Sequence, residues 1–147
     1  MEIKISRINT NALYTLSEFR INGSHFAFVL ESTPNMLPKS KYIVRLSKHS
    51  CRKQNIYLYT KAPEGSKHPY QPTKVAIVLG NSWKEAERSH NIIIGTPLIP
   101  GVMYKGQPLY EQLIDRITKC SERKEPITLK ITNHHMRYMH AISHWLS

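Results

Sequence analysis

The sequence has few cysteines, few acidic residues and no long apolar run, and each absence excludes a class of protein. Its two cysteines, Cys51 and Cys120, are too few and too far apart for a disulfide framework or a zinc site. We interpret them as reduced thiols, with a single bridge between them as the alternative. No apolar run approaches the ~20 residues of a membrane span, and the N-terminal segment MEIKISRI has no apolar signal core. We therefore expect no membrane insertion and no signal peptide.

Acidic residues are outnumbered by basic ones, and this imbalance is the strongest compositional signal. The 147 residues include 21 Lys plus Arg against 10 Asp plus Glu, a formal net charge of +11. Such a charge predicts attraction to polyanions: nucleic acid, anionic glycans, acidic membranes or acidic protein partners. Apolar residues make up 40 % of the chain, enough for one packed core in a domain of ordinary size.

Alternating apolar residues predict a mainly β fold. Strands are expected at residues 3–6, 13–21, 25–30, 42–47, 56–60, 75–79, 92–94 and 127–132. The Asn22-Gly23 turn predicts a hairpin between the second and third, because both residue types tolerate positive φ. The prolines of residues 62–73 predict a loop, and Gly80 and Gly95 are expected to end the strands before them.

Two helices are expected late in the chain. Apolar residues at helical spacing predict one over Leu109 to Ile117, and Asn133 can cap another over about His134 to Leu146. We therefore divide the chain into a β domain, residues 1–132, and a His-rich helical extension, residues 133–147. His140 and His144 lie one helical turn apart, which is metal-ligand spacing, but no Cys, Asp or Glu follows Glu125 to complete a site. They are weak candidates, and we predict no metal and no cofactor.

Several short motifs follow one another in an order found in a known family. They are Arg7, the Asn22-Gly23 turn closing on Leu30-Glu31, Leu37-Pro38 before Tyr42-Ile43-Val44, Ile77 to Asn81, His90 to Gly95, the helix Leu109 to Ile117 and the strand Ile127 to Ile131. This series resembles a family of short bacterial and phage domains of unknown function that are similar to the L,D-transpeptidases. The resemblance implies a mainly β (β+α) single domain, an L,D-transpeptidase-like β-sandwich or barrel with one or two late helices.

The chain departs from that family at the two positions that matter for catalysis. The transpeptidase cysteine attacks an acyl carbonyl after activation by a histidine. The histidine position is occupied here by Val78, and the cysteine position by Asn91, or by Ile92 in another register. The resemblance therefore implies a degenerate pocket without catalytic residues, lined by Val78, Gly80, Asn81, Ser89, His90 and Asn91. Ser89 and His90 are adjacent, so on a strand they would point to opposite faces and form no nucleophile–base pair.

A basic stretch without any acidic residue runs from Ser32 to Pro63. Tyr42, Tyr57 and Tyr59 lie among its cations. Cations neutralise phosphates and aromatic rings stack on bases or sugars, and contact with an acidic protein neighbour is an alternative of at least equal weight. The predicted basic surface consists of Lys39, Lys41, Arg45, Lys48, Arg52, Lys53 and Lys61.

Three functions follow from these observations. The first is a non-catalytic binding or structural module made in the cytoplasm, with protein neighbours in a phage virion or phage-like secretion particle, as the resemblance implies. The second is a peptidoglycan-acting enzyme with a replaced nucleophile such as Cys51, whose neighbours Arg52 and Lys53 would lower the pKa of its thiol. The third is a nucleic-acid-binding basic protein.

Overall fold

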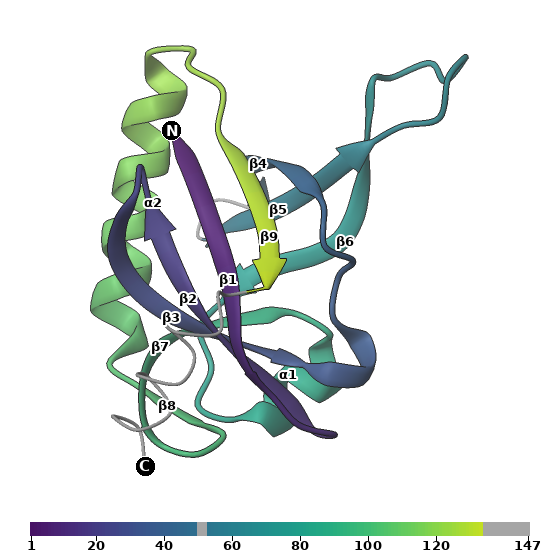
Figure 1. Ribbon diagram of the computed structural model, residues 1–147. Coiled ribbons are helices and arrows are strands. Elements are labelled where there is room, and N and C mark those ends of the chain that lie inside the picture. The colour runs from purple at the N-terminus through teal and green to yellow at the C-terminus, as the bar shows by residue number, and fades with distance from the viewer. Residues whose placement is uncertain (50–52, 134–147) are drawn as a thin grey trace.

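The computed structural model describes residues 1–49 and 53–133, which form nine strands and two α-helices (Figure 1). The strands are β1 (Glu2–Thr10), β2 (Tyr14–Ile21), β3 (Ser24–Ser32), β4 (Lys41–His49), β5 (Lys53–Lys61), β6 (Tyr70–Val78), β7 (Ile92–Ile99), β8 (Val102–Tyr104) and β9 (Thr128–Asn133). The helices are α1 (Trp83–Ser89) and α2 (Gly106–Glu122), and a short 3₁₀ turn covers Thr33–Asn35. The expectation of a mainly β fold is therefore confirmed.

All nine strands belong to one sheet that closes on itself. The strand order is β3-β2-β1-β9-β4-β5-β6-β7-β8, and β3 also pairs with β7. Eight strands thus form a barrel, with β8 attached to β7. Only the β1–β9 and β6–β7 pairs are parallel; the other pairs are antiparallel. Closure gives every barrel strand a partner on both sides over part of its length and so shortens the free edges that promote aggregation.

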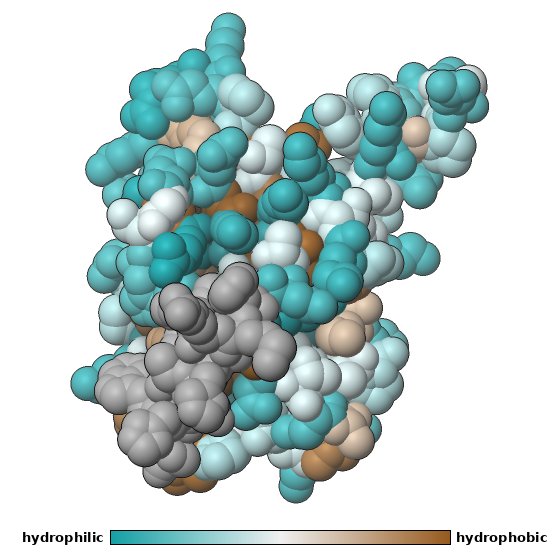
Figure 2. Space-filling model, viewed as in Figure 1, coloured by the Kyte–Doolittle hydropathy of each residue, from teal (hydrophilic) through white to brown (hydrophobic). Residues whose placement is uncertain are grey.

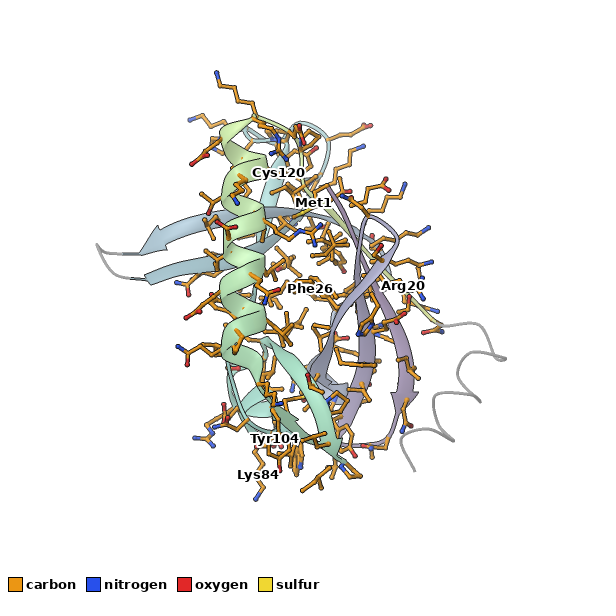
Figure 3. All side chains as sticks on the ribbon, turned by 90° about the vertical axis from the view of Figure 1, so that its left-hand side faces the viewer. Met1, Arg20, Phe26, Lys84, Tyr104 and Cys120 are labelled. Atoms are coloured by element: carbon orange, nitrogen blue, oxygen red, sulfur yellow. The ribbon has the colours of Figure 1, made fainter. Side chains whose placement is uncertain are left out.

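Alternate residues of the strands fill the barrel. Ile3 and Ile5 of β1, Phe19 of β2 and Leu58 of β5 are at most 2 % exposed and belong to one apolar cluster. The apolar face of α2 completes this cluster with Leu113, Ile117 and Cys120. In Figure 3, α2 runs alongside the strands, and Phe26 of β3 lies next to it, 5.9 Å from the Arg116 guanidinium.

A second apolar cluster lies on the outer side of β3 and β7, beneath α1 and β8. Phe28 and Leu30 of β3 and Ile93 of β7 pack there against Ala86 of α1 and Met103 of β8. Because both faces of β3 and β7 are covered, their sequences are continuously apolar instead of alternating. This explains the apolar run Ile92-Ile93-Ile94.

The Asn22-Gly23 hairpin is confirmed, since the two residues have φ of 50° and 85° and connect β2 to β3. The prediction of a loop over residues 62–73 is wrong at its end, because β6 begins at Tyr70 and contains Pro72. At Pro72 the strand pairs with β5 alone, since β7 joins β6 only at Ile77 and Val78. Proline is tolerated where a strand has one free side.

The expectation that Gly95 ends its strand is also wrong, because β7 continues to Ile99. Gly95 is needed there because β8 approaches closely: a Cβ on Gly95 would lie 3.0 Å from Met103 Cβ and from the Tyr104 carbonyl oxygen. The short elements α1 and β8 were not predicted. The expected helix over His134 to Leu146 lies outside the described residues, as do His140 and His144.

Candidate functional site

The residues expected to line a degenerate pocket flank helix α1, between β6 and β7. Val78, Ser89 and Asn91 line one hollow together with Glu85 and Arg88. Gly80 and Asn81 line a different hollow, next to Tyr104 of β8 and Lys105 of the β8–α2 connection. Val78 and Asn91, the two positions at which the resemblance expects histidine and cysteine, therefore lie on the same hollow, whereas Asn81 and Asn91 do not.

The polar groups of this region connect α1 to the barrel. The Asn91 side-chain oxygen accepts a hydrogen bond from the Ala76 backbone N–H at 3.0 Å. The Asn91 backbone N–H donates to Ser89 Oγ at 3.2 Å, and Ser89 Oγ donates to the Glu85 carbonyl at 2.8 Å. His90 is exposed and closes α1 in the left-handed conformation, with φ of 61°. Ser89 and His90 thus have structural roles, and neither is placed to activate the other.

The cysteines do not complete a catalytic site in the described part of the chain. Cys120 is a free thiol on α2, 1 % exposed, within 3.7 Å of the Glu125 carbonyl oxygen. Cys51 lies outside the described residues. Among residues 1–49 and 53–133, no three His, Cys, Asp or Glu side chains come together as metal ligands.

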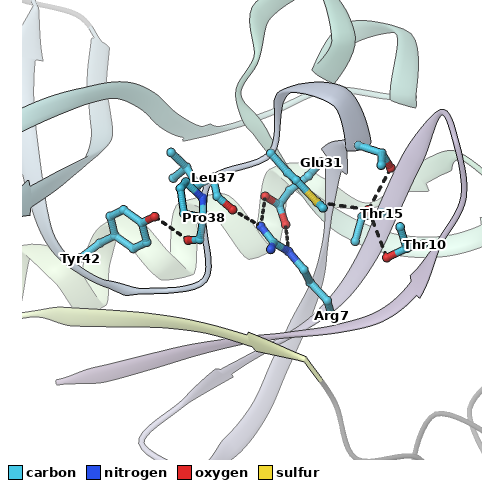
Figure 4. Close-up of polar contacts among 9 residues, drawn as sticks. Arg7, Thr10, Thr15, Glu31, Leu37, Pro38 and Tyr42 are labelled. Carbon is cyan, nitrogen blue, oxygen red and sulfur yellow. Dashed lines mark hydrogen bonds and ion pairs between the residues drawn. The ribbon is translucent and has the colours of Figure 1, made fainter.

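Inside one end of the barrel, Arg7 and Glu31 form a buried ion pair (Figure 4). Arg7 donates from Nε to one Glu31 oxygen at 3.2 Å and from Nη2 to the other at 3.1 Å. Nη2 also donates to the Leu37 carbonyl. Burial raises the pKa of the Glu31 carboxyl, and the adjacent guanidinium opposes that rise. With 5 % and 2 % exposure, these two side chains contact other parts of the chain and leave no face for a ligand.

The outer face of the barrel has the opposite character. Four cations lie side by side on the neighbouring strands β2, β1, β9 and β4. Arg20 pairs with Lys4, Lys4 pairs with Lys130, and Lys130 pairs with Lys41. We call these four residues the cation row. Adjacent strands are about 4.8 Å apart, so the row spans about 14 Å across the sheet. Successive side chains of a strand point to opposite faces of the sheet. Because Ile3, Ile5 and Leu129 are buried inside the barrel, Lys4 and Lys130 between or beside them point outward.

Three members of the cation row form no ion pair with any other described residue. Arg20 is bound to Glu18 at 2.6 Å, but Lys4, Lys41 and Lys130 are exposed and form no ion pair within that part of the chain. Figure 2 shows mainly hydrophilic residues over β9 and the start of β1. Like charges directly opposite each other on paired strands are destabilising. The row is therefore an arrangement that an anion would stabilise.

The cation row continues into a group of aromatic side chains on β5 and β6. The Arg45 guanidinium lies 5.3 Å from the centre of the Tyr59 ring and 5.7 Å from that of Tyr70. We call Arg45, Tyr59 and Tyr70 the tyrosine cluster. Lys61, which is exposed, pairs with Tyr70 at the end of β5.

The predicted basic surface is thus only partly described, and it is incomplete. Lys39, Lys41, Arg45 and Lys61 are exposed, whereas Lys48 and Lys53 have no described side chain and Arg52 lies outside the described residues. The prediction missed Lys4, Lys130 and Arg20. Their strands are remote in sequence, and only the pairing of β1 with β9 and of β9 with β4 brings them together.

Comparison with known proteins gives no match: no family model, curated protein or solved structure is significantly similar to this chain. None of the helices in the described part of the chain is long and apolar enough to span a membrane.

Proposed function

We propose that this protein is a non-catalytic binding module whose outer barrel face holds an extended polyanion along the cation row. The observation that supports this proposal is the register of Lys4, Lys130 and Lys41 on three adjacent strands, where they are exposed and form no ion pair with any other described residue. Several aligned cations match a ligand with several anionic groups better than a single ion.

The energetics favour a polymer that brings its own charges. Each lysine of the row repels the next, and this repulsion is relieved when anionic groups lie between them. A polyanion also releases its condensed counterions on binding, which makes the affinity strongly dependent on salt. The buried pair Arg7–Glu31 offers no such gain, because its charges already neutralise each other.

Binding of labelled polyanions to two matched double variants tests the proposal. Lys4→Gln/Lys130→Gln removes two cations of the row, and Lys84→Gln/Lys105→Gln removes two exposed lysines away from it, which leaves the two variants with the same net charge. In Figure 3, Lys84 lies at the lower end of the molecule, away from Arg20 of the cation row. We expect the row variant to lose affinity for a heparin fragment and for an oligonucleotide by roughly tenfold. Its log–log salt slope should fall by about 1.4–1.8.

The control variant should bind nearly as the wild type does. An equal loss in both variants would mean that net charge alone attracts the polymer, and the cation row would then have no special role. Absence of binding by the wild-type protein at low salt would refute the proposed function itself.

We also propose that the barrel is a degenerate L,D-transpeptidase-like domain from a phage or phage-like particle. Its support is the ordered motif series, together with the position of Val78 and Asn91 on one hollow; the position of Asn81 on a different hollow counts against it. The proposal expects no turnover when the protein is incubated with muropeptides. Turnover that disappears on Cys51→Ala would instead favour a peptidoglycan-acting enzyme with a replaced nucleophile.

A further inference from the structure

We infer that the polyanion is a single-stranded nucleic acid, with its phosphates along the cation row and its bases stacked on the tyrosine cluster. The inference rests on the proposed function, since it names the ligand class of the same face. Its basis is the juxtaposition, on one continuous sheet surface, of two tyrosine rings with a row of lysines that form no ion pair among the described residues.

The two groups of side chains are joined through β4. Ile43 pairs with Tyr59 on one side and with Thr128 on the other, and Lys41 pairs with Lys130. Lys41 lies two residues before Ile43, so both point outward from the barrel. Lys41 and Tyr59 are therefore diagonal neighbours, about 7–8 Å apart at their Cα atoms. One chain of nucleotides can contact both groups without any rearrangement of the barrel.

The tyrosine cluster favours bases over other anionic partners. Tyr59 and Tyr70 are half-buried, and the Arg45 guanidinium lies against both rings. Base–aromatic stacking and stacking on arginine are the usual means of binding single strands without sequence preference. A sulfated glycan or an acidic peptide segment of Asp and Glu has no flat π-face to offer. A duplex keeps its bases stacked inside, where these rings do not reach them.

The acidic residues on this face favour one orientation of the bound nucleic acid, with its bases toward β5. Glu18 is buried and bound to Arg20 and His25, at 2.6 Å and 2.9 Å. Glu2 is exposed and pairs with Thr128 at the end of the line formed by Tyr59, Ile43 and Thr128. Its charge repels phosphates beside Lys4 on the flank of the row, so the backbone is held over the row, with its bases toward β5.

Fluorescence anisotropy with the full chain tests the inference, using three probes at equal salt: labelled dT20, a duplex of the same length, and a labelled heparin fragment. The variant is Tyr59→Leu/Tyr70→Leu, which keeps apolar bulk and removes the rings. Its matched control is Tyr104→Leu, an exposed tyrosine on β8, outside the row and the tyrosine cluster.

We expect the wild-type protein to bind dT20 more tightly than the duplex. The double tyrosine variant should lose affinity for dT20 by at least about tenfold, while its affinity for heparin stays unchanged. Tyr104→Leu should alter neither. Thermal unfolding of each variant checks folding, and the single variant Tyr70→Leu, at the start of β6, replaces the double variant if that one does not fold.

Several results would overturn the inference. Equal binding of dT20 and heparin, with no effect of the tyrosine variant on either, would leave a polyanion-binding row without base stacking. Tighter binding of the duplex than of dT20 by the wild-type protein would also mean that the row binds polyanions without base stacking. In both cases the proposed function survives, because the Lys4→Gln/Lys130→Gln variant would still weaken binding. Absence of binding to all three probes would remove the proposed function and this inference together.

Discussion

Strand β1 has two cations, three residues apart, in opposite environments. Arg7 points into the barrel, is 5 % exposed and forms two hydrogen bonds with the Glu31 carboxylate. Lys4 points outward, is exposed and lies directly between the cations Arg20 and Lys130 of the neighbouring strands. The same strand thus places one charge in a complete polar network and the other in a line of like charges.

This difference between Arg7 and Lys4 distinguishes a charge that the fold needs from one that it does not need. Inside the barrel an unpaired charge would cost several kcal/mol, so Arg7 is positioned by Glu31 and by the Leu37 carbonyl. Outside, water screens the lysines, and nothing in the barrel needs three of them side by side. A row of like charges costs stability, and its lysines form no ion pair with any other described residue, so we assign binding of an anionic partner to the outer face.

The largest expected effect comes from removing the inner cation. Arg7→Met leaves the Glu31 carboxylate buried without its counter-charge, and we expect the free energy of unfolding at neutral pH to fall by about 3–5 kcal/mol. Urea-induced unfolding followed by circular dichroism measures this loss.

The pH dependence of that loss identifies its cause. Burial raises the pKa of Glu31 above its ordinary value of 4.5, and loss of Arg7 raises it further. A carboxyl whose pKa is higher in the folded than in the unfolded protein stabilises the fold when it is protonated. This contribution is complete below the unfolded-state pKa of about 4.5 and is lost as the pH rises through the folded-state pKa. The deficit of Arg7→Met should therefore shrink as pH falls toward 4.5. In Arg7→Met/Glu31→Gln the deficit should be smaller at neutral pH. A deficit of the same size at every pH would contradict the charge-based account.

A smaller effect of opposite sign is expected at Ser17, which pairs with Arg7 across β1 and β2. Its hydroxyl is fully buried and has no hydrogen-bond partner within the part of the chain that the structure describes. Ser17→Ala should therefore stabilise the fold by about 1 kcal/mol, the lower end of the cost of an unsatisfied buried hydroxyl.

Thr15→Val is the matched control, because the Thr15 hydroxyl bonds to those of Thr10 and Thr33, at 3.3 Å and 2.9 Å. It should lose stability by about 1 kcal/mol in the same urea experiment. If Ser17→Ala were destabilising too, the Ser17 hydroxyl would belong to the inner network, and the contrast between the two sides of β1 would be stronger still.

Local patterns in the sequence predicted most of the strands but not their arrangement. The alternation in residues 127–132 and the Asn22-Gly23 turn depend on neighbouring residues, so both could be recognised. The extension of β7 past Gly95 depends on Met103 and Tyr104 packing against it, which no local pattern indicates. Helix α1 has seven residues and buries only Ala86, too little for a periodic signal.

The sequence predicted that the candidate site is basic, but it did not predict which strands contribute to it. An acid-free stretch around β4 and β5 was visible in the sequence, and it supplied Lys41 and Arg45. Lys4 and Lys130 are 126 positions apart along the chain. They meet because β1 and β9 pair in parallel, a long-range contact that sequence periodicity does not encode. Surfaces assembled from distant strands are in general invisible to a search for charged runs.

The smallest expected effect concerns the cation row itself and tests the comparison most directly. Replacing Lys130, which lies between Lys4 and Lys41, with Gln removes two like-charge contacts at once. We expect Lys130→Gln to raise the stability of the free protein by about 0.2–1 kcal/mol at low salt. The gain should vanish near 1 M salt, where the screening length is about 3 Å. Lys84→Gln, an exposed lysine on α1 outside the row, should show neither the gain nor its salt dependence. A loss of stability in Lys130→Gln would make this lysine part of the fold, as Arg7 is, and the case for an anionic partner on β1, β9 and β4 would then lose its physical basis.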